Sequence, residues 1–311
     1  LFKPEDAYRT TGGGGFPLPP TATVGENPGS GVVVNYWLKD KVSKEVKIEF
    51  LDPSGSAIRT FTKRAEGSGG GDGTAPGGGG GGRRGGGGDP AVSADAGLNT
   101  FVWNFRRPNA ATIDPLILWA GSITGPRVPP GNYQVRLSVD GKPVGTESFA
   151  IKEDPRVPVT QADLDAQYDL MMKIHDKLNA THGAILDIRE MKTQLDGVRS
   201  RVRGDKALAD MVADITKKLT SVEEALVQTK IHAGQDALNF PIRLNNKLAA
   251  LSSSVDSSDA PPTAQQLAVF ADLSAQVDKQ LAELARIKSS ELADFNKQYS
   301  AKGLPVVSST R

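Results

Sequence analysis

The sequence predicts two folding units: an Ig-like β-sandwich followed by an antiparallel three-helix bundle. In the first half, apolar residues alternate with polar ones in short runs, which is typical of half-buried strands. From residue 160 onward they recur every three to four residues in two seams, which is typical of amphipathic helices. Pro155 and Pro158 lie where the period changes. At 311 residues the chain is long enough for both units.

The distribution of Gly and Pro along the chain predicts the domain boundaries. Residues 1–31 are rich in Gly and Pro and are expected to form an extended arm, and residues 153–159 a Pro-containing linker. We therefore expect the sandwich at 32–152, the bundle at 160–302 and a tail at 303–311.

About seven short strands are expected in the sandwich, which suits an Ig-like fold. Asp52–Gly55 reads as a turn, and Asp140-Gly141 as a type I′ hairpin turn, because both residues tolerate positive φ. The expected strands fall within 32–40, 45–52, 57–62, 99–105, 116–121, 132–139 and 145–151.

The helical half carries start and stop signals. Thr160 with Asp163 forms an acidic capping box, and the first helix runs to about residue 202 with Leu178 in one of its seams. Asp205 caps a second helix, which should break or kink near Asn239 because of Pro241 and then resume. A third helix follows the capping box of Thr263 and Gln266. Short connections between three such helices predict an up-down-up bundle.

The segment from Gly67 to Pro90, GSGGGDGTAPGGGGGGRRGGGGDP, resembles a phosphate loop only in its glycine content. A phosphate loop needs Gly-Lys-Ser/Thr leading into a helix, whereas here Arg83 and Arg84 lead towards a strand. RNA-binding tracts repeat the arginine many times, and this segment does not. We interpret residues 67–88 as a disordered insertion between two strands, without chemistry of its own.

No sequence motif identifies a catalytic reaction. The chain has no cysteine, which excludes disulfides, thiolate metal sites and cysteine nucleophiles. Of its three histidines, His175 and His182 lie two turns apart on one helix, too far apart for one metal ion without a further element. We interpret them as helix-surface or seam-edge residues, and acidic pairs such as Glu223 with Glu224 as solvated or paired groups. We therefore expect no catalytic residue, no metal and no cofactor.

The charge balance excludes two kinds of partner. Lys plus Arg total 37 and Asp plus Glu 36, so a formal charge of +1 gives no general attraction to nucleic acid or to anionic lipid. No apolar run is long enough for a transmembrane helix.

Several stretches carry a resemblance to a known family. They are YWLKDKVSKEVKIEFLDPSGSAIRTF, GLNTFVWNFRRP, LILWAGSITGPRVPPGNYQVRLSVDGK and DPRVPVTQADLDAQYDLMMKIHDKLNATHGAILDIREMKTQL. Together they resemble the C-terminal region of large secreted bacterial sortilin-like, BNR-repeat β-propeller proteins, often labelled glycosyl hydrolase. The resemblance implies an Ig-like domain similar to that of flagellar hook-capping proteins, followed by a helical region. The propeller itself does not lie within these residues, so no catalytic residue is carried over.

These observations predict a non-catalytic accessory or scaffold part of an exported envelope protein, periplasmic or extracellular. It would act by protein–protein contact, for instance with subunits of a larger membrane-associated complex. The candidate interaction surface is formed by Arg106, Arg107 and Arg127, in loops of the sandwich, together with Trp119 from the expected strand at 116–121. Two alternatives stay open: the accessory C-terminal region of a propeller-type glycoside hydrolase, and a carbohydrate-binding module built on the aromatic residues.

Overall fold

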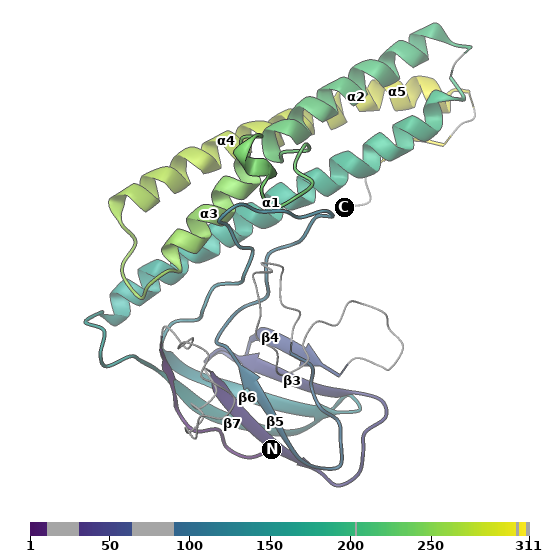
Figure 1. Ribbon diagram of the computed structural model, residues 1–311. Coiled ribbons are helices and arrows are strands. Elements are labelled where there is room, and N and C mark those ends of the chain that lie inside the picture. The colour runs from purple at the N-terminus through teal and green to yellow at the C-terminus, as the bar shows by residue number, and fades with distance from the viewer. Residues whose placement is uncertain (11–30, 64–89, 203, 303–304, 309–311) are drawn as a thin grey trace. The chain divides into compact units, whose positions relative to one another are not determined.

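The structure is a computed structural model that describes residues 1–10, 31–63, 90–202, 204–302 and 305–308 (Figure 1). The predicted insertion at 67–88 and most of the predicted N-terminal arm lie outside these residues. The chain divides into two compact units that are discontinuous in sequence. Unit 1 contains the strands, the start of the first helix up to Tyr168 and residues 258–261, and unit 2 contains the remaining helical residues together with residues 109–123.

Unit 1 holds two sheets and not the predicted Ig-like sandwich. Five strands form a curled mixed sheet in the order β1-β7-β6-β3-β4, and the remaining two pair as a separate β2-β5 ribbon. All neighbours are antiparallel except β1 and β7, which are parallel. The strands are β1 (Ala7–Arg9), β2 (Val32–Leu38), β3 (Val46–Leu51), β4 (Ala57–Thr62), β5 (Gly97–Trp103), β6 (Gly131–Val139) and β7 (Lys142–Glu153).

Two local departures account for the wrong prediction of the sandwich. Residues 116–121, expected as a strand, have no strand structure and belong to unit 2. Residues 7–9, expected within the arm, instead add β1 as a parallel edge strand beside β7. Among the described residues the second sheet is consequently left with two strands, too few to face the first as an Ig-like sandwich does.

Side chains that the period-two pattern predicts to be buried are buried in the structure. Trp103 is fully buried and stacks on Phe50, with ring centroids 4.2 Å apart. The turn between β6 and β7 is also confirmed, since Asp140 and Gly141 have φ values of 49° and 76°.

The helices of unit 2 do not form the predicted three-helix bundle. The expected second helix is two separate helices, α2 and α3, and the expected third is divided at Ser290 into α4 and α5. The elements are α1 (Gln161–Arg199), α2 (Lys206–Leu226), the 3₁₀ turn η1 (Asp236–Leu238), α3 (Leu244–Val255), α4 (Ala264–Ser289) and α5 (Glu291–Ser300).

The second helix ends earlier than the proline alone predicts. The sequence after Leu226 is rich in β-branched residues and Gly, which favour helix weakly. Thr229 and Ala233, which the seam pattern assigned to the core, are exposed. The chain re-enters a helix only at Leu244, after Pro241.

Three predicted helix starts are confirmed. The Thr160 hydroxyl donates to the Asp163 carboxylate at 2.7 Å, and the Asp163 N–H donates back to that hydroxyl oxygen. Asp205 accepts from the Leu208 N–H, and Thr263 forms a full capping box with Gln266.

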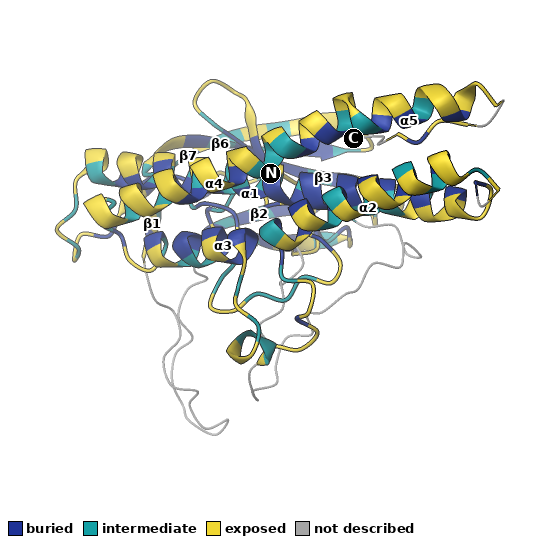
Figure 2. Ribbon diagram, turned by 90° about the horizontal axis from the view of Figure 1, so that it is seen from above, coloured by how far each residue is buried: buried dark blue, intermediate teal, exposed yellow. Residues whose placement is uncertain are grey.

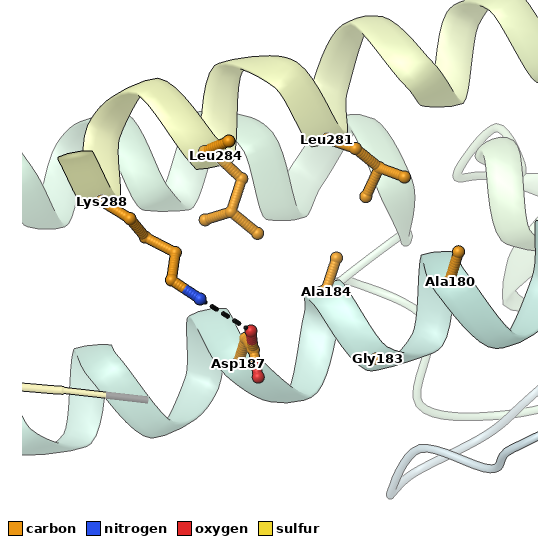
Figure 3. A pocket seen from close by; sticks show the side chains of 8 residues that line it. Ala180, Gly183, Ala184, Asp187, Leu281, Leu284 and Lys288 are labelled. Atoms are coloured by element: carbon orange, nitrogen blue, oxygen red, sulfur yellow. Dashed lines mark hydrogen bonds and ion pairs between the residues drawn. The ribbon is translucent and has the colours of Figure 1, made fainter. Parts of the chain in front are cut away.

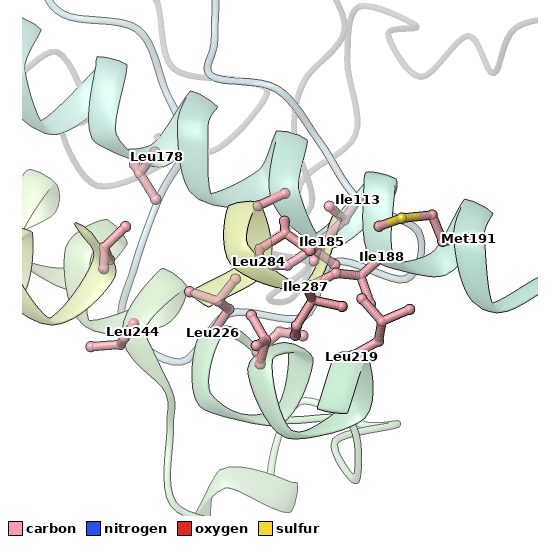
Figure 4. Close-up of a cluster of buried hydrophobic side chains, with 14 of the residues drawn as sticks. Ile113, Leu178, Ile185, Ile188, Met191, Leu219, Leu226, Leu244, Leu284 and Ile287 are labelled. Atoms are coloured by element: carbon pink, nitrogen blue, oxygen red, sulfur yellow. The ribbon is translucent and has the colours of Figure 1, made fainter. Parts of the chain in front are cut away.

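Each long helix shows one buried and one exposed face (Figure 2). Both predicted seams of α1 are buried, including Leu178 and Ile185. Figure 4 shows these side chains together with Ile113, which comes from the irregular segment 109–123 and is 2% exposed. The core of unit 2 therefore includes a segment that was predicted to belong to the sandwich.

Candidate functional site

The structure places two of the predicted surface arginines in contacts within unit 1. The Arg106 guanidinium donates to the Gly125 carbonyl at 2.9 Å, and that of Arg107 donates to the Tyr168 hydroxyl at 3.0 Å. Both residues are half-buried. Neither side chain is therefore presented as a simple exposed anchor.

Arg127, the third predicted surface arginine, lies in a buried charge cluster. Its side chain is 9% exposed and donates to the Asp259 carboxylate at 3.0 Å. Arg9, from β1, donates to the same oxygen at 3.2 Å and to the Gln167 side chain at 2.8 Å. Two buried guanidinium groups thus share one carboxylate, which makes Asp259 a structural residue of unit 1.

Trp119, the fourth predicted residue, belongs to an irregular segment fixed to the helices of unit 2. We call residues 109–123 the docked loop. Its two ends meet through a hydrogen bond from the Ala110 N–H to the Ile123 carbonyl at 2.8 Å. The Ala111 N–H donates to the Asn179 side chain on α1 at 2.7 Å, and the Asp114 carbonyl accepts from Arg189 at 2.7 Å. An irregular segment on a rigid helical support is a common location for binding residues.

The α3 side of the docked loop is held by one buried asparagine. The Asn246 side chain is almost fully buried, accepts from the Trp119 N–H and donates to the Trp119 C=O, both at 2.8 Å. The Ser122 N–H donates to the Ala249 carbonyl, and a side chain at Gly121 would come within 2.8 Å of the Ala249 methyl group. The backbone on both sides of the tryptophan is therefore fixed, while the residue itself remains 40% exposed.

His182 holds the α1 side of the docked loop. It is fully buried, in contrast to the predicted helix-surface or seam-edge position. Its Nδ1 lies 2.5 Å from the Ala111 carbonyl oxygen and must donate, so Nε2 is left to accept from the Asn245 amide at 3.5 Å. Burial lowers the pKa of His182 and outweighs the opposite effect of the Ala111 hydrogen bond. The neutral imidazole is thus a structural hydrogen-bonding group.

Glu223 on α2 is also buried; of the two predicted alternatives, solvated or paired, it is paired, with cations of the neighbouring helix α1. Arg189 and Lys192 both donate to its carboxylate at 2.8 Å. Burial alone would raise the pKa of Glu223, but these two hydrogen bonds hold it below its ordinary value.

A pocket of about 340 Å³ lies between α1 and α4 (Figure 3). Its walls are mostly apolar, and its polar groups are Asp187 and Lys288, which form an ion pair at 3.1 Å. The second carboxylate oxygen of Asp187 is buried without a hydrogen-bond partner. The residues that line the pocket therefore include one ion pair on an apolar surface, without a nucleophile or a second acid beside it.

The described residues contain no group of three or more His, Cys, Asp or Glu side chains arranged to hold a metal ion. Within the same residues, no helix is both long enough and apolar enough to cross a bilayer. Comparisons with family models, with curated proteins and with solved structures find no match to the chain.

Sequence reasoning included Trp119 in the candidate surface but placed it in an expected strand, and it missed the residues that position it. Asn245, Asn246 and His182 lie on helix faces that turn inward, where polar side chains are costly unless they are hydrogen-bonded. The signal that could have found them is the pair of adjacent asparagines in the apolar stripe LNNKL.

Proposed function

We propose that the chain is a non-catalytic interaction module that binds a protein partner through the docked loop, with Trp119 as the central anchor. The observation that carries this proposal is the arrangement around Asn246, which fixes the backbone of Trp119 on both sides of a partly exposed indole. Trp is the residue type most enriched among interface hot spots.

The physical advantage of this arrangement is preorganisation. Binding loses affinity when loops and side chains must be ordered at the interface. In the docked loop much of that order exists before binding, because its backbone is hydrogen-bonded to α1 and α3. A partner then needs chiefly a pocket for the partly exposed indole.

We further propose that the chain is exported and works as an accessory or scaffold part of a larger periplasmic or extracellular assembly. The family resemblance of the sequence supports this location. The four-residue surface predicted from the sequence is narrowed here to Trp119, since the three arginines have partners within unit 1.

Site-specific photo-crosslinking in the source cells tests the proposal. A photoreactive phenylalanine analogue replaces Trp119 in one variant and Trp37 in a control, because Trp37 is 60% exposed but lies in unit 1. We expect a discrete protein adduct from position 119 and none from position 37. Absence of an adduct at 119, or the same adducts from both positions, would refute the proposed surface.

One observation favours a second function, carbohydrate binding. On the outer face of the β2-β5 ribbon, Trp37 lies opposite Leu98, and both are more than half exposed. Beside them Thr100 donates to Asn35 at 2.7 Å, which leaves the asparagine amide to donate to a hydroxyl group. An aromatic ring beside polar groups can bind a sugar face. Glycan-array binding that is lost in Trp37→Ala and retained in Trp119→Ala would establish this function.

A further inference from the structure

A short extended segment near the end of the chain lies against Gln194 of α1 and Asn296 of α5, and we call the surface that it covers there the groove. We call residues 305–308 the docked tail. The Asn296 side chain on α5 donates to the Val307 carbonyl at 2.6 Å and accepts from the Val307 N–H at 2.8 Å. The Gln194 side chain on α1 does the same for Ser308, at 2.6 and 3.0 Å.

On the side of the docked tail, these four hydrogen bonds involve only backbone N–H and C=O groups. Successive side chains of the docked tail alternate, as they do in an extended strand. Val306 is 56% exposed, Val307 is 2% exposed within the core of unit 2, and Ser308 is again exposed. Selectivity therefore rests on one buried, branched aliphatic side chain.

We propose that this groove is a peptide-binding site that accepts an extended segment of another protein chain, with a Val or Ile in the position of Val307. The docked tail acts as its built-in competitor. Recognition of peptide backbone combined with a pocket for one side chain is a general way of binding extended peptides. A foreign segment with the same backbone and a branched aliphatic residue would make the same contacts.

The docked tail is suited to displacement. Apart from the groove contacts of Val307 and Ser308, the neighbouring residues Pro305 and Val306 are exposed. For the described residues 305–308, exchange requires opening of four hydrogen bonds and withdrawal of one buried side chain. This proposal does not depend on Trp119, which lies on the docked loop.

The test is binding of a fluorescent peptide, KGLPVVSSTR, to full-chain variants, measured by anisotropy. In Val307→Asp the competing tail should leave the groove, because its buried side chain becomes charged. The matched control is Val306→Asp, which changes the exposed neighbour. We expect Val307→Asp to bind the peptide at least about 10-fold more tightly than the parent or the control, since a cis-occupied site lowers the apparent affinity. Adding Gln194→Ala and Asn296→Ala should abolish that gain.

Equal affinity of the parent, Val306→Asp and Val307→Asp would overturn the proposal, as would no binding to a Val307→Asp chain whose circular dichroism matches the parent. If Val307→Asp does not fold, Val307→Ala replaces it, with the same order of affinities expected and a smaller difference. A peptide carrying Asp in place of the second Val should not bind any variant, and binding of that peptide would also refute the groove.

Discussion

Replacing Asn246 with alanine tests how firmly the docked loop is held. In Asn246→Ala the N–H and the C=O of Trp119 each lose a hydrogen bond of 2.8 Å. A bond of this kind contributes net about 0.5–1.5 kcal/mol, so the two together contribute about 1–3 kcal/mol. Alanine favours the helix by up to about 0.7 kcal/mol more than asparagine. Water can also reach the freed groups, because Trp119 is 40% exposed. We therefore expect a loss of about 1–2 kcal/mol in the free energy that holds the loop on α3.

Amide hydrogen exchange of residues 109–123 measures this loss directly. If the loop opens locally, exchange of the Ser122 N–H, which keeps its bond to the Ala249 carbonyl in Asn246→Ala, should become roughly 5- to 30-fold faster, since 1.4 kcal/mol corresponds to a factor of ten. The control is Asn239→Ala, at an exposed asparagine outside the docked loop. Unchanged exchange at Ser122 in Asn246→Ala, or an equal change in the control, would refute the reasoning.

Three further predictions concern buried ionisable side chains. Asp259→Ala leaves the buried Arg9 and Arg127 without their carboxylate and should cost about 3–5 kcal/mol in urea unfolding; a loss below about 1 kcal/mol would contradict it. The lowered pKa of His182 means that its stabilising contribution is complete above pH 6.5 and declines as the pH falls below that ordinary value. A His182→Gln variant should therefore lose less stability than the parent between pH 7 and pH 5, and equal pH profiles would count against this. Asp187→Leu should change the unfolding free energy by less than about 1 kcal/mol. The substitution removes a buried carboxylate that has one unpaired oxygen, and the partner Lys288 keeps 35% side-chain exposure to water. A loss above about 2 kcal/mol would refute this prediction.

The parts of the fold that depend on local pattern could be predicted from the sequence. Helix starts at Thr160, Asp205 and Thr263 follow from side chains that satisfy the first N–H groups of a helix. The hairpin at Asp140-Gly141 follows from the backbone conformations that those two residues tolerate. In each case the decisive interaction lies within a few residues.

What could not be predicted depends on contacts between distant residues. The apolar run at 116–121 reads as a strand, because periodicity cannot distinguish a strand from an irregular segment that packs its side chains on helices. Its conformation is set by Asn246, more than one hundred residues away. The same limit hid the burial of Arg127, whose partner Asp259 lies in the loop between α3 and α4. The parallel strand β1 was missed because residues 7–9 are too few to show a period.

The central claim is that the docked loop presents Trp119 in a fixed position to a protein partner. Calorimetric titration of the partner identified by crosslinking tests it most directly, with the parent, Trp119→Ala, Asn246→Ala and Trp37→Ala compared. We expect Trp119→Ala to weaken binding about 30-fold or more, which corresponds to a hot-spot loss of about 2 kcal/mol. Asn246→Ala, which keeps the indole but frees its backbone, should weaken binding by a smaller factor, and Trp37→Ala should leave the affinity unchanged. A Trp119→Ala variant that binds the partner as tightly as the parent would contradict the claim.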